Sequence, residues 1–382
     1  MDGIEIVHSG DDFFERLLEI ISKAQKEIHL QTYIFDHDST GILIAHALKE
    51  AADRNVKVYV LLDSYGARSL PSSFINDLVK HNIHFRYFSP LFSFNNFYLG
   101  RRLHQKVVVA DGVEAMVGGI NIADKYRGTH EKHPWLDYAI HVKGEVALSL
   151  QELCRNFFYK KKKFRRVRVP FVFKHENGPI IRILRNDWLK RRNDIGRSYL
   201  RSFKSTKKEV IILGSYFFPG KRFLSILNKT ARKRGVKVKL ILSKNVDVPI
   251  VGRATRYLYG SLMKNNVEIY EWKRSVLHGK VAVIDNKWST IGSFNINHLS
   301  SYGSIELNIG VHSEEFSNEL STELNKIISQ CDFVSKENLK LENNAFSKVL
   351  DAISYYMLRF LSVAVTYFSY KRFFKSLVNN EE

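Results

Sequence analysis

Two copies of one short motif constrain this chain more than any other feature. The first spans Leu103–Asp111 and the second Leu277–Asp285, and each reads His-x-Lys-x4-Asp. In both copies six residues separate the aspartate from a glycine, and an asparagine stands three positions after that glycine. One such match is readily accidental. A second copy with the same downstream spacing indicates an internal duplication.

The residues around each motif predict how it presents its side chains. Apolar β-branched residues surround both copies, which predicts two buried strands. Because side chains alternate along a strand, His104 and Lys106 point the same way, as do His278 and Lys280. An ammonium suits a phosphate, and an imidazole can be a nucleophile or a general acid near neutral pH. The alternative is that each His-x-Lys lies in an ordinary amphipathic strand with no catalytic role. A duplicated pair makes this alternative far less favoured than a single copy does.

The remaining duplicated residues complete a predicted phosphodiester site. Asp111 and Asp285 follow their strands at predicted turns, where we expect them to orient the site or the turn rather than touch substrate. Asn121 and Asn295 are predicted to bind phosphoryl oxygens, and Ser293 is expected to add a hydroxyl there. In such a site one histidine attacks phosphorus, the other protonates the leaving alkoxide, and no metal is required.

The paired motifs resemble the hallmark of the phospholipase D superfamily, over roughly residues 4–320. Within it the chain is most similar to bacterial cardiolipin synthases. The segments that carry this similarity are Gln31–Phe35, Val58–Asp63, Arg102–Ile122 and Ser215–Pro219. The resemblance implies two similar halves that share one active site and a phosphohistidine intermediate without a cofactor. It also implies a catalytic set consisting of His104, Lys106, Asp111, His278, Lys280 and Asp285.

Two acids occupy equivalent places downstream of the motifs. Asp137 and Glu306 each lie within an apolar stretch that is predicted to form a strand. A carboxylate that accepts a hydrogen bond from imidazole Nδ1 fixes the tautomer and stabilises the imidazolium. The resemblance supports this His-orienting role for Glu306, and the repeat extends it to Asp137. The alternative for both is a surface acid at a strand edge.

The order of strands and helices is also repeated between the halves. For example, Lys26–Leu30 is echoed by Lys208–Ile212, and Arg54–Val58 by Arg234–Val238. Strands that alternate with helices predict the α/β class. We expect two pseudo-symmetric α/β sandwich halves, one active site at their interface and a C-terminal helical tail. The predicted units are a first half (1–158), a basic segment partly belonging to the second half (159–207), a second half (208–335) and a tail (336–382).

Charge and apolar segments predict the partners. A net charge of +20 indicates an anionic partner, either nucleic acid or a membrane. Between Lys160 and Lys208 the chain has 18 Lys and Arg against three acids. The insertion Ser89–Arg101 is aromatic and is predicted to form a membrane-dipping lip or a loop folded on the core. Val349–Val378 is predicted to be an interfacial helix; packing on the protein or on a second copy is the alternative.

The aromatic insertion and the apolar tail favour a lipid substrate, and the resemblance then implies a phosphatidyl transferase that makes cardiolipin from phosphatidylglycerol or a related donor and releases glycerol. The alternatives are hydrolysis of phospholipid, a nuclease and a catalytically idle membrane scaffold. We find no nucleic-acid-binding module, so nucleic acid is the less favoured partner. The N-terminus lacks an apolar signal core, and two cysteines make no disulfide framework. We therefore expect a peripheral or tail-anchored protein on the cytoplasmic side of a bacterial membrane.

Overall fold

The computed structural model describes residues 3–89, 101–159, 171–174, 178–187, 190, 192–297, 300, 303–342 and 344–378. The aromatic residues of the insertion (Phe92, Phe94, Phe97 and Tyr98) and the lysine run at 160–163 lie outside these ranges. The predictions of a membrane-dipping lip and of an anion-binding lysine run therefore stay predictions.

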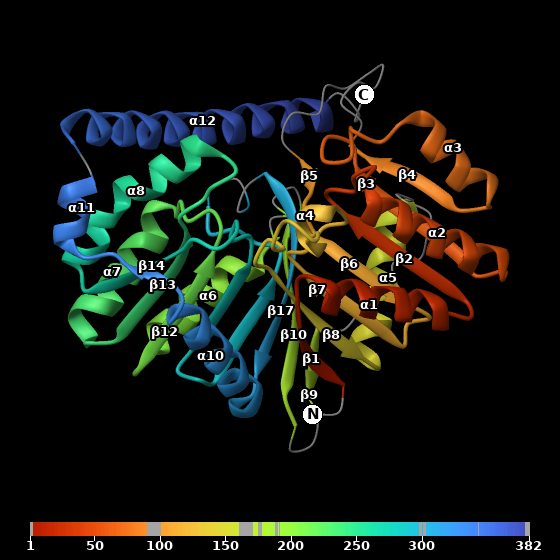
Figure 1. Ribbon diagram of the computed structural model, residues 1–382, viewed down its shortest axis with the longest axis horizontal. Coiled ribbons are helices and arrows are strands. Elements are labelled where there is room, and N and C mark those ends of the chain that lie inside the picture. Colours follow the sequence, from red (N-terminus) through yellow and green to blue (C-terminus); the bar gives the residue numbers. More distant parts are fainter. Residues whose placement is uncertain are drawn as a thin grey trace.

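The first half forms a seven-stranded mixed sheet with helices on both faces (Figure 1). Its elements in chain order are β1 (Ile4–His8), α1 (Asp11–Lys23), β2 (Glu27–Thr32), α2 (Ser39–Asp53), β3 (Lys57–Asp63), α3 (Ser72–Lys80), β4 (His84–Phe88), β5 (Arg102–Leu103), β6 (Lys106–Ala110), β7 (Glu114–Gly118), α4 (Asp124–Arg127), β8 (Tyr138–Lys143) and α5 (Glu145–Tyr159). The strand order in the sheet is β1-β8-β7-β6-β2-β3-β4, so the motif strand β6 lies near the centre.

The second half repeats this arrangement in an eleven-stranded sheet. Its elements are β9 (Val172–Lys174), β10 (Ile180–Asp187), β11 (Arg192–Asn193), α6 (Asp194–Ser205), β12 (Glu209–Gly214), α7 (Lys221–Arg234), β13 (Lys237–Ser243), α8 (Pro249–Lys264), β14 (Val267–Trp272), β15 (Lys280–Ile284), β16 (Trp288–Gly292), β17 (Ser304–His312), α10 (Glu314–Ile328) and β18 (Asp332–Phe333). The order β10-β17-β16-β15-β12-β13-β14 matches the first sheet strand for strand.

The direction of each strand pair is repeated as well. In both sheets the pair after the motif strand is antiparallel, and the next two pairs, β2–β3–β4 and β12–β13–β14, are parallel. Each crossover helix ends near a residue with positive φ, Asn55 before β3 and Gly235 before β13. Glycine and asparagine tolerate this left-handed conformation, which turns the chain back onto the sheet. The α/β class and the duplication are confirmed.

Three large apolar clusters among the described residues hold the layers together. One lies between the first sheet and the outer helices α1 and α2, and a second lies between the second sheet and α6, α7 and α8. The third joins the two halves, because it combines buried residues of both sheets with residues of α5 and α10. It includes Tyr138, Leu213 and Leu307, each at most 1% exposed. Burial of apolar surface therefore fixes one half against the other.

Two short strand contacts interlock the halves beside the motifs. β5 of the first half pairs in parallel with the start of β17 in the second half. Leu136, which precedes β8, bridges Leu277, which precedes His278. A backbone segment of the first half thus pairs with the second half next to each of the two motif histidines.

The tail forms α11 (Lys336–Glu342) and the long helix α12 (Ala345–Val378), which lies along the edge of the molecule above α8 (Figure 1). Polar contacts attach α12 to the second half. Asp351 pairs with Arg253 at 3.3 Å, and Arg359 donates to the carbonyl oxygen of Pro219 at 3.3 Å. The tail thus packs on the protein. Among the described helices, none combines the length and the apolarity needed to cross a bilayer.

Candidate active site

The two motif strands bring each histidine and lysine together as the spacing predicts. His104 lies between β5 and β6, and Lys106 is the first residue of β6. The Lys106 ammonium donates to the carbonyl oxygen of His104 at 2.6 Å. In the second half the Lys280 ammonium likewise donates to the carbonyl oxygen of His278. Both lysines are buried, with at most 4% of their surface exposed, so their charges act in a medium of low dielectric constant.

Each histidine is oriented by an acid from the opposite half. His104 Nδ1 lies 2.9 Å from Oε2 of Glu306, and His278 Nδ1 lies 2.6 Å from Oδ2 of Asp137. Both acids are fully buried. A carboxylate oxygen only accepts, so Nδ1 of His104 carries the hydrogen and its Nε2 keeps its lone pair. Nδ1 of His278 also lies 2.8 Å from the Lys280 ammonium, and its shorter contact with the Asp137 carboxylate favours the same tautomer. The strand contacts between the halves explain why each acid comes from the opposite half. The pairing of β5 with β17 places His104 beside Glu306, and the bridge between Leu136 and Leu277 places Asp137 beside His278.

The two acid–histidine pairs differ in how the acid is held. Ser293 donates to Glu306 Oε2 at 2.5 Å and accepts from the Leu307 amide at 3.1 Å. Its hydroxyl therefore positions the acid, and binding of the substrate phosphate by Ser293 stays a prediction. The equivalent residue is Gly119, where an added Cβ would lie 2.4 Å from Oδ1 of Asp137. The glycine makes room for the acid in one half, and the serine holds the acid in the other.

The motif aspartates lie away from the histidines. Asp111 accepts from the backbone amides of residues 25–27 at 2.7 to 2.8 Å, and Asp285 accepts from those of 207–209 at 2.8 to 2.9 Å. Each aspartate stands five positions after the motif lysine, roughly 16 Å along an extended strand. Both aspartates have a φ of 54° and cap the start of the neighbouring strand. The Asp111 and Asp285 carboxylates therefore organise a turn, and fewer residues of the catalytic set that the resemblance implies lie beside the histidines.

The two asparagines are held beside the histidines by residues that sequence reasoning did not single out. Asn121 Oδ1 accepts from the Thr32 hydroxyl at 3.3 Å, and Asn295 Oδ1 accepts from the Ser215 hydroxyl at 2.7 Å. Asn121 Nδ2 donates to the Tyr126 hydroxyl at 2.7 Å. Asn295 Nδ2 has no hydrogen bond to any described residue, so this donor is the one open to a ligand.

Three tyrosines surround the histidines. The Tyr33 ring lies 5.1 Å from the His104 ring, and the Tyr216 ring lies 6.3 Å from the His278 ring. The Tyr126 hydroxyl lies 3.5 Å from His278 Nε2, whereas no hydrogen bond joins His104 Nε2 to a described residue. The repeat carried a signal for two of them, since Thr32-Tyr33 and Ser215-Tyr216 both follow equivalent strands.

One buried acid of the first half fixes the approach to His104. Asp63, at the end of β3, accepts from the Leu103 amide at 2.8 Å and from the amides of residues 65 and 66. It also lies 3.6 Å from the Arg102 guanidinium. Burial raises the pKa of Asp63 above its usual range. The acid holds the residue directly before the histidine, and no motif in the sequence indicated it.

Burial and the two like charges shift the titration of the site. Desolvation, reinforced by the Lys280 charge, lowers the pKa of Lys106 to about 7, and desolvation lowers the pKa of Lys280 to about 8. Burial and Lys280 lower the pKa of His278 to about 3, and burial lowers the pKa of His104. Both imidazoles are thus neutral in the free protein, and the lysines gain protons readily when an anion enters.

Comparison with known proteins places these observations in a family. The chain matches the family described as "Cardiolipin synthase, PLD-like domain" over residues 17–132 and 199–328. It is 35% identical to cardiolipin synthase B of Escherichia coli (strain K12) over 339 residues, and 37% identical to that of Salmonella typhi over 333 residues. Each alignment covers 85% of this chain and 80% of the relative.

A solved structure shares the fold at low sequence identity. The phosphatidylserine synthase of Haemophilus influenzae Rd KW20 superposes with a TM-score of 0.74 at 15% identity, covering 96% of this chain and 94% of that one. The similarity spans both halves, so the two-half architecture belongs to the whole chain.

Proposed function

The chain belongs to the phospholipase D-like cardiolipin synthase family, and on this premise we propose that it is a phosphatidyl transferase that makes cardiolipin from phosphatidylglycerol. One observation carries the chemistry: two imidazoles, each contacted at Nδ1 by a buried acid of the opposite half. This arrangement supplies one nucleophile and one proton carrier to a single phosphodiester.

The first step forms a covalent intermediate on His104. Its Nε2 has no described hydrogen-bond partner, whereas Nε2 of His278 faces the Tyr126 hydroxyl at 3.5 Å. His104 Nε2 attacks the phosphorus of phosphatidylglycerol, and the bond from phosphorus to the glycerol oxygen breaks. His278, which gains a proton beside the bound phosphate anion, passes it to that oxygen, and glycerol leaves. Glu306 balances the positive charge that stays on the phosphorylated imidazole.

The second step transfers the phosphatidyl group. His278 takes the proton from a glycerol hydroxyl of a second phosphatidylglycerol, and that oxygen attacks the phosphorus. The bond from phosphorus to His104 breaks and cardiolipin leaves. Lys106, Lys280 and the Asn295 amide lie where they stabilise the phosphoryl oxygens in both steps. Water that attacks in place of the second lipid yields phosphatidic acid, which is the hydrolase alternative.

The outward face of α12 supports action at a membrane surface. Six residues at spacings of three and four form an apolar stripe, each more than half exposed: Phe346, Val349, Ile353, Tyr356, Phe360 and Val363. Tyr356 lies at the edge of the stripe, where its hydroxyl is 3.2 Å from that of Tyr257 on α8. The inward face carries Asp351, Ser354 and Ser362, which are at most 7% exposed. A helix that turns polar residues inward and apolar residues outward is typical of an interfacial helix.

We therefore propose a peripheral protein whose α12 stripe, the residues just named, lies in the membrane interface. Association of two copies through α12 and placement on the cytoplasmic side of a bacterial membrane stay predictions.

Product analysis tests the proposed reaction. Purified protein in detergent micelles is incubated with phosphatidylglycerol labelled in its glycerol head group, and the products are resolved. Equal amounts of cardiolipin and free glycerol support the transferase. Phosphatidic acid as the sole lipid product points to the hydrolase. Turnover that persists in both His104→Ala and His278→Ala contradicts the two-histidine mechanism.

A further inference from the structure

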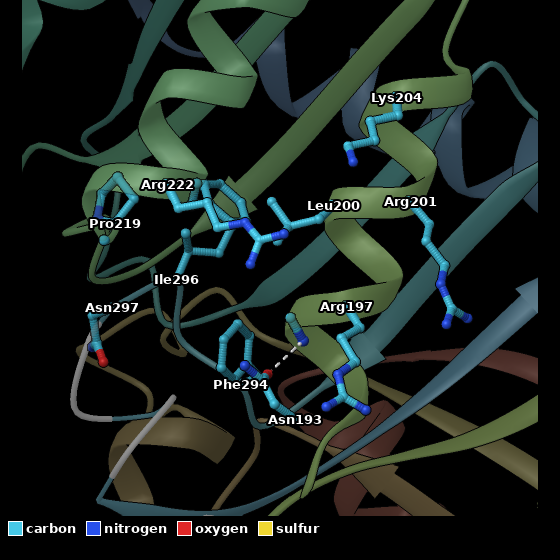
Figure 2. Close-up of a pocket in the computed structure, with 13 residues that line it drawn as sticks. Asn193, Arg197, Leu200, Arg201, Lys204, Pro219, Arg222, Phe294, Ile296 and Asn297 are labelled. Carbon is cyan, nitrogen blue, oxygen red and sulfur yellow. Dashed lines mark hydrogen bonds between the residues drawn. The ribbon is translucent and has the colours of Figure 1, made fainter.

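A cavity of about 470 Å³ lies outside the histidine site, between α6 and the start of α7 (Figure 2). Its size falls within the range of about 300–1,000 Å³ that is common for small-molecule sites. The motif histidines and lysines do not line it. It is therefore a separate concave feature of the second half.

The cavity has an apolar floor and a cationic rim. Phe294 and Ile296 form the floor and are at most 5% exposed. In Figure 2 Leu200 extends from α6 over this floor, and the Lys204 and Arg222 side chains reach toward the opening from opposite walls. The described lining residues include no aspartate or glutamate. This combination fits a ligand with an anionic group next to a hydrocarbon chain.

The rim arginines are available to an anion. Arg197 and Arg222 are both exposed, and neither forms an ion pair or a side-chain hydrogen bond with any described residue. Elsewhere in the same half an exposed arginine is paired, as Arg253 is with Asp351. A guanidinium binds phosphate through parallel hydrogen bonds, which makes arginine the residue suited to this anion.

The cavity borders the loop that carries Asn295 on one side and the segment that contacts α12 on the other. Phe294 and Ile296 flank Asn295, whose side chain bonds with Ser215 in the histidine site. On the other side, the carbonyl of the lining residue Pro219 accepts from Arg359 of α12. A lipid that enters from the membrane interface can thus occupy the cavity and contact the back of the loop that carries the open amide donor.

We propose that this cavity binds a second anionic phospholipid that does not react. Its phosphate binds Arg197 and Arg222, and the first carbons of an acyl chain cover Phe294 and Ile296, while the rest of the lipid stays in the membrane. This proposal rests on the proposed function in one respect: the substrate of that reaction, an anionic phospholipid, is also taken as the ligand of the cavity. Binding itself requires no turnover.

Hydrogen exchange read by mass spectrometry tests this site directly. The full chain with His104→Ala, which prevents turnover, is titrated with short-chain dihexanoyl phosphatidylglycerol. We expect slower exchange in residues 197–204 and 221–226. Arg197→Gln with Arg222→Gln should raise the half-saturating concentration at least tenfold. Lys229→Gln with Arg232→Gln makes the same change of charge on exposed residues of α7 that do not line the cavity, and should leave it unchanged.

Two further ligands show whether the cavity recognises an anionic phospholipid or a free phosphate. Dihexanoyl phosphatidylcholine, which is zwitterionic, should protect neither segment. Equal protection by inorganic phosphate at the same concentration overturns the lipid assignment, and so does no protection by phosphatidylglycerol. Exchange of α5 reports that the variants are folded. Protection at the cavity together with no cardiolipin synthesis by the wild-type protein refutes the proposed function alone, whereas cardiolipin synthesis by the wild-type protein without protection at the cavity refutes the cavity proposal alone.

Discussion

Replacing Glu306 with glutamine tests the acid–histidine pairing most sharply, because the structure fixes how the amide sits. Both hydrogen bonds of the carboxylate use one oxygen: Oε2 accepts from His104 Nδ1 at 2.9 Å and from the Ser293 hydroxyl at 2.5 Å. The other oxygen, Oε1, is buried and has no hydrogen-bond partner among the described residues. A glutamine can keep both bonds through its oxygen and place its NH2 group at the empty position.

The variant therefore loses mainly the negative charge. A hydrogen bond to a charged group contributes about 1.5–3 kcal/mol, against roughly 1 kcal/mol for a neutral one. Two unit charges about 4 Å apart interact by about 4 kcal/mol at an effective dielectric constant of 20. Since about 1.4 kcal/mol is tenfold in rate, glycerol release should slow between about 10-fold and 10³-fold.

The matching variant in the other half should be slower still. Asp137 accepts on both oxygens, from His278 Nδ1 at 2.6 Å and from the Tyr138 amide at 2.7 Å. An asparagine there must present its NH2 group to one of these donors, which breaks a buried hydrogen bond and removes the charge as well.

Rapid-quench measurement of labelled glycerol release compares the two variants with wild type. Glu319→Gln, at an exposed position of α10, is the control for a lost surface charge. A Glu306→Gln rate within threefold of wild type refutes the role of the charge. A smaller loss for Asp137→Asn than for Glu306→Gln refutes the hydrogen-bond assignment.

Three further predictions follow from the same geometry. Gly119→Ser should reduce turnover more than 100-fold, because an added Cβ at Gly119 meets Asp137. Ser293→Gly should reduce turnover only about tenfold, because Glu306 keeps its bond to His104 without the serine. Steady-state kinetics that reverse this order contradict the asymmetry between the two halves. Folding lowers the pKa of Lys106 to about 7 from its unfolded value of about 10.5. Between about pH 7 and about pH 10.5 the unfolded chain therefore binds more protons than the folded chain, and the lysine destabilises the fold more at pH 7 than at pH 10. Lys106→Met should therefore stabilise the protein against urea more at pH 7 than at pH 10, and an equal gain at both refutes the shift. Ile353→Glu with Phe360→Glu should weaken binding to phosphatidylglycerol vesicles at least tenfold in a sedimentation assay, while Lys336→Glu, which alters net charge equally, should have a much smaller effect.

The duplicated motif made the strands, the sheet class and the histidine–lysine pairs predictable, because spacing along a strand determines which side chains share a face. It did not predict which acid serves which histidine. That depends on β5 crossing to β17 and on Leu136 crossing to Leu277, and both are contacts between segments more than 100 residues apart. The sequence placed Asp137 and Glu306 as equivalents but left their partners open.

The contacts that the sequence left open concern side chains whose partners come from elsewhere in the chain. Ser293 stands two positions before Asn295, and only the structure shows that its hydroxyl donates to Glu306. Asp63 follows a buried strand like many other acids, and only the fold shows that it holds the Leu103 amide. The tail was predicted as an interfacial helix or as a helix packed on the protein. In the structure α12 packs on α8, and the exposed stripe reaches α8 through Tyr356 at its edge.

Isolation of the covalent intermediate tests the central claim most directly. Protein mixed with phosphatidylglycerol labelled in an acyl chain is quenched within one turnover and digested, and the peptides are sequenced by mass spectrometry. We expect a phosphatidyl group on His104, one per active chain at most, and its loss in His104→Ala. A label on the His278 peptide alone reverses the assigned roles. Synthesis of cardiolipin without any labelled histidine contradicts the mechanism.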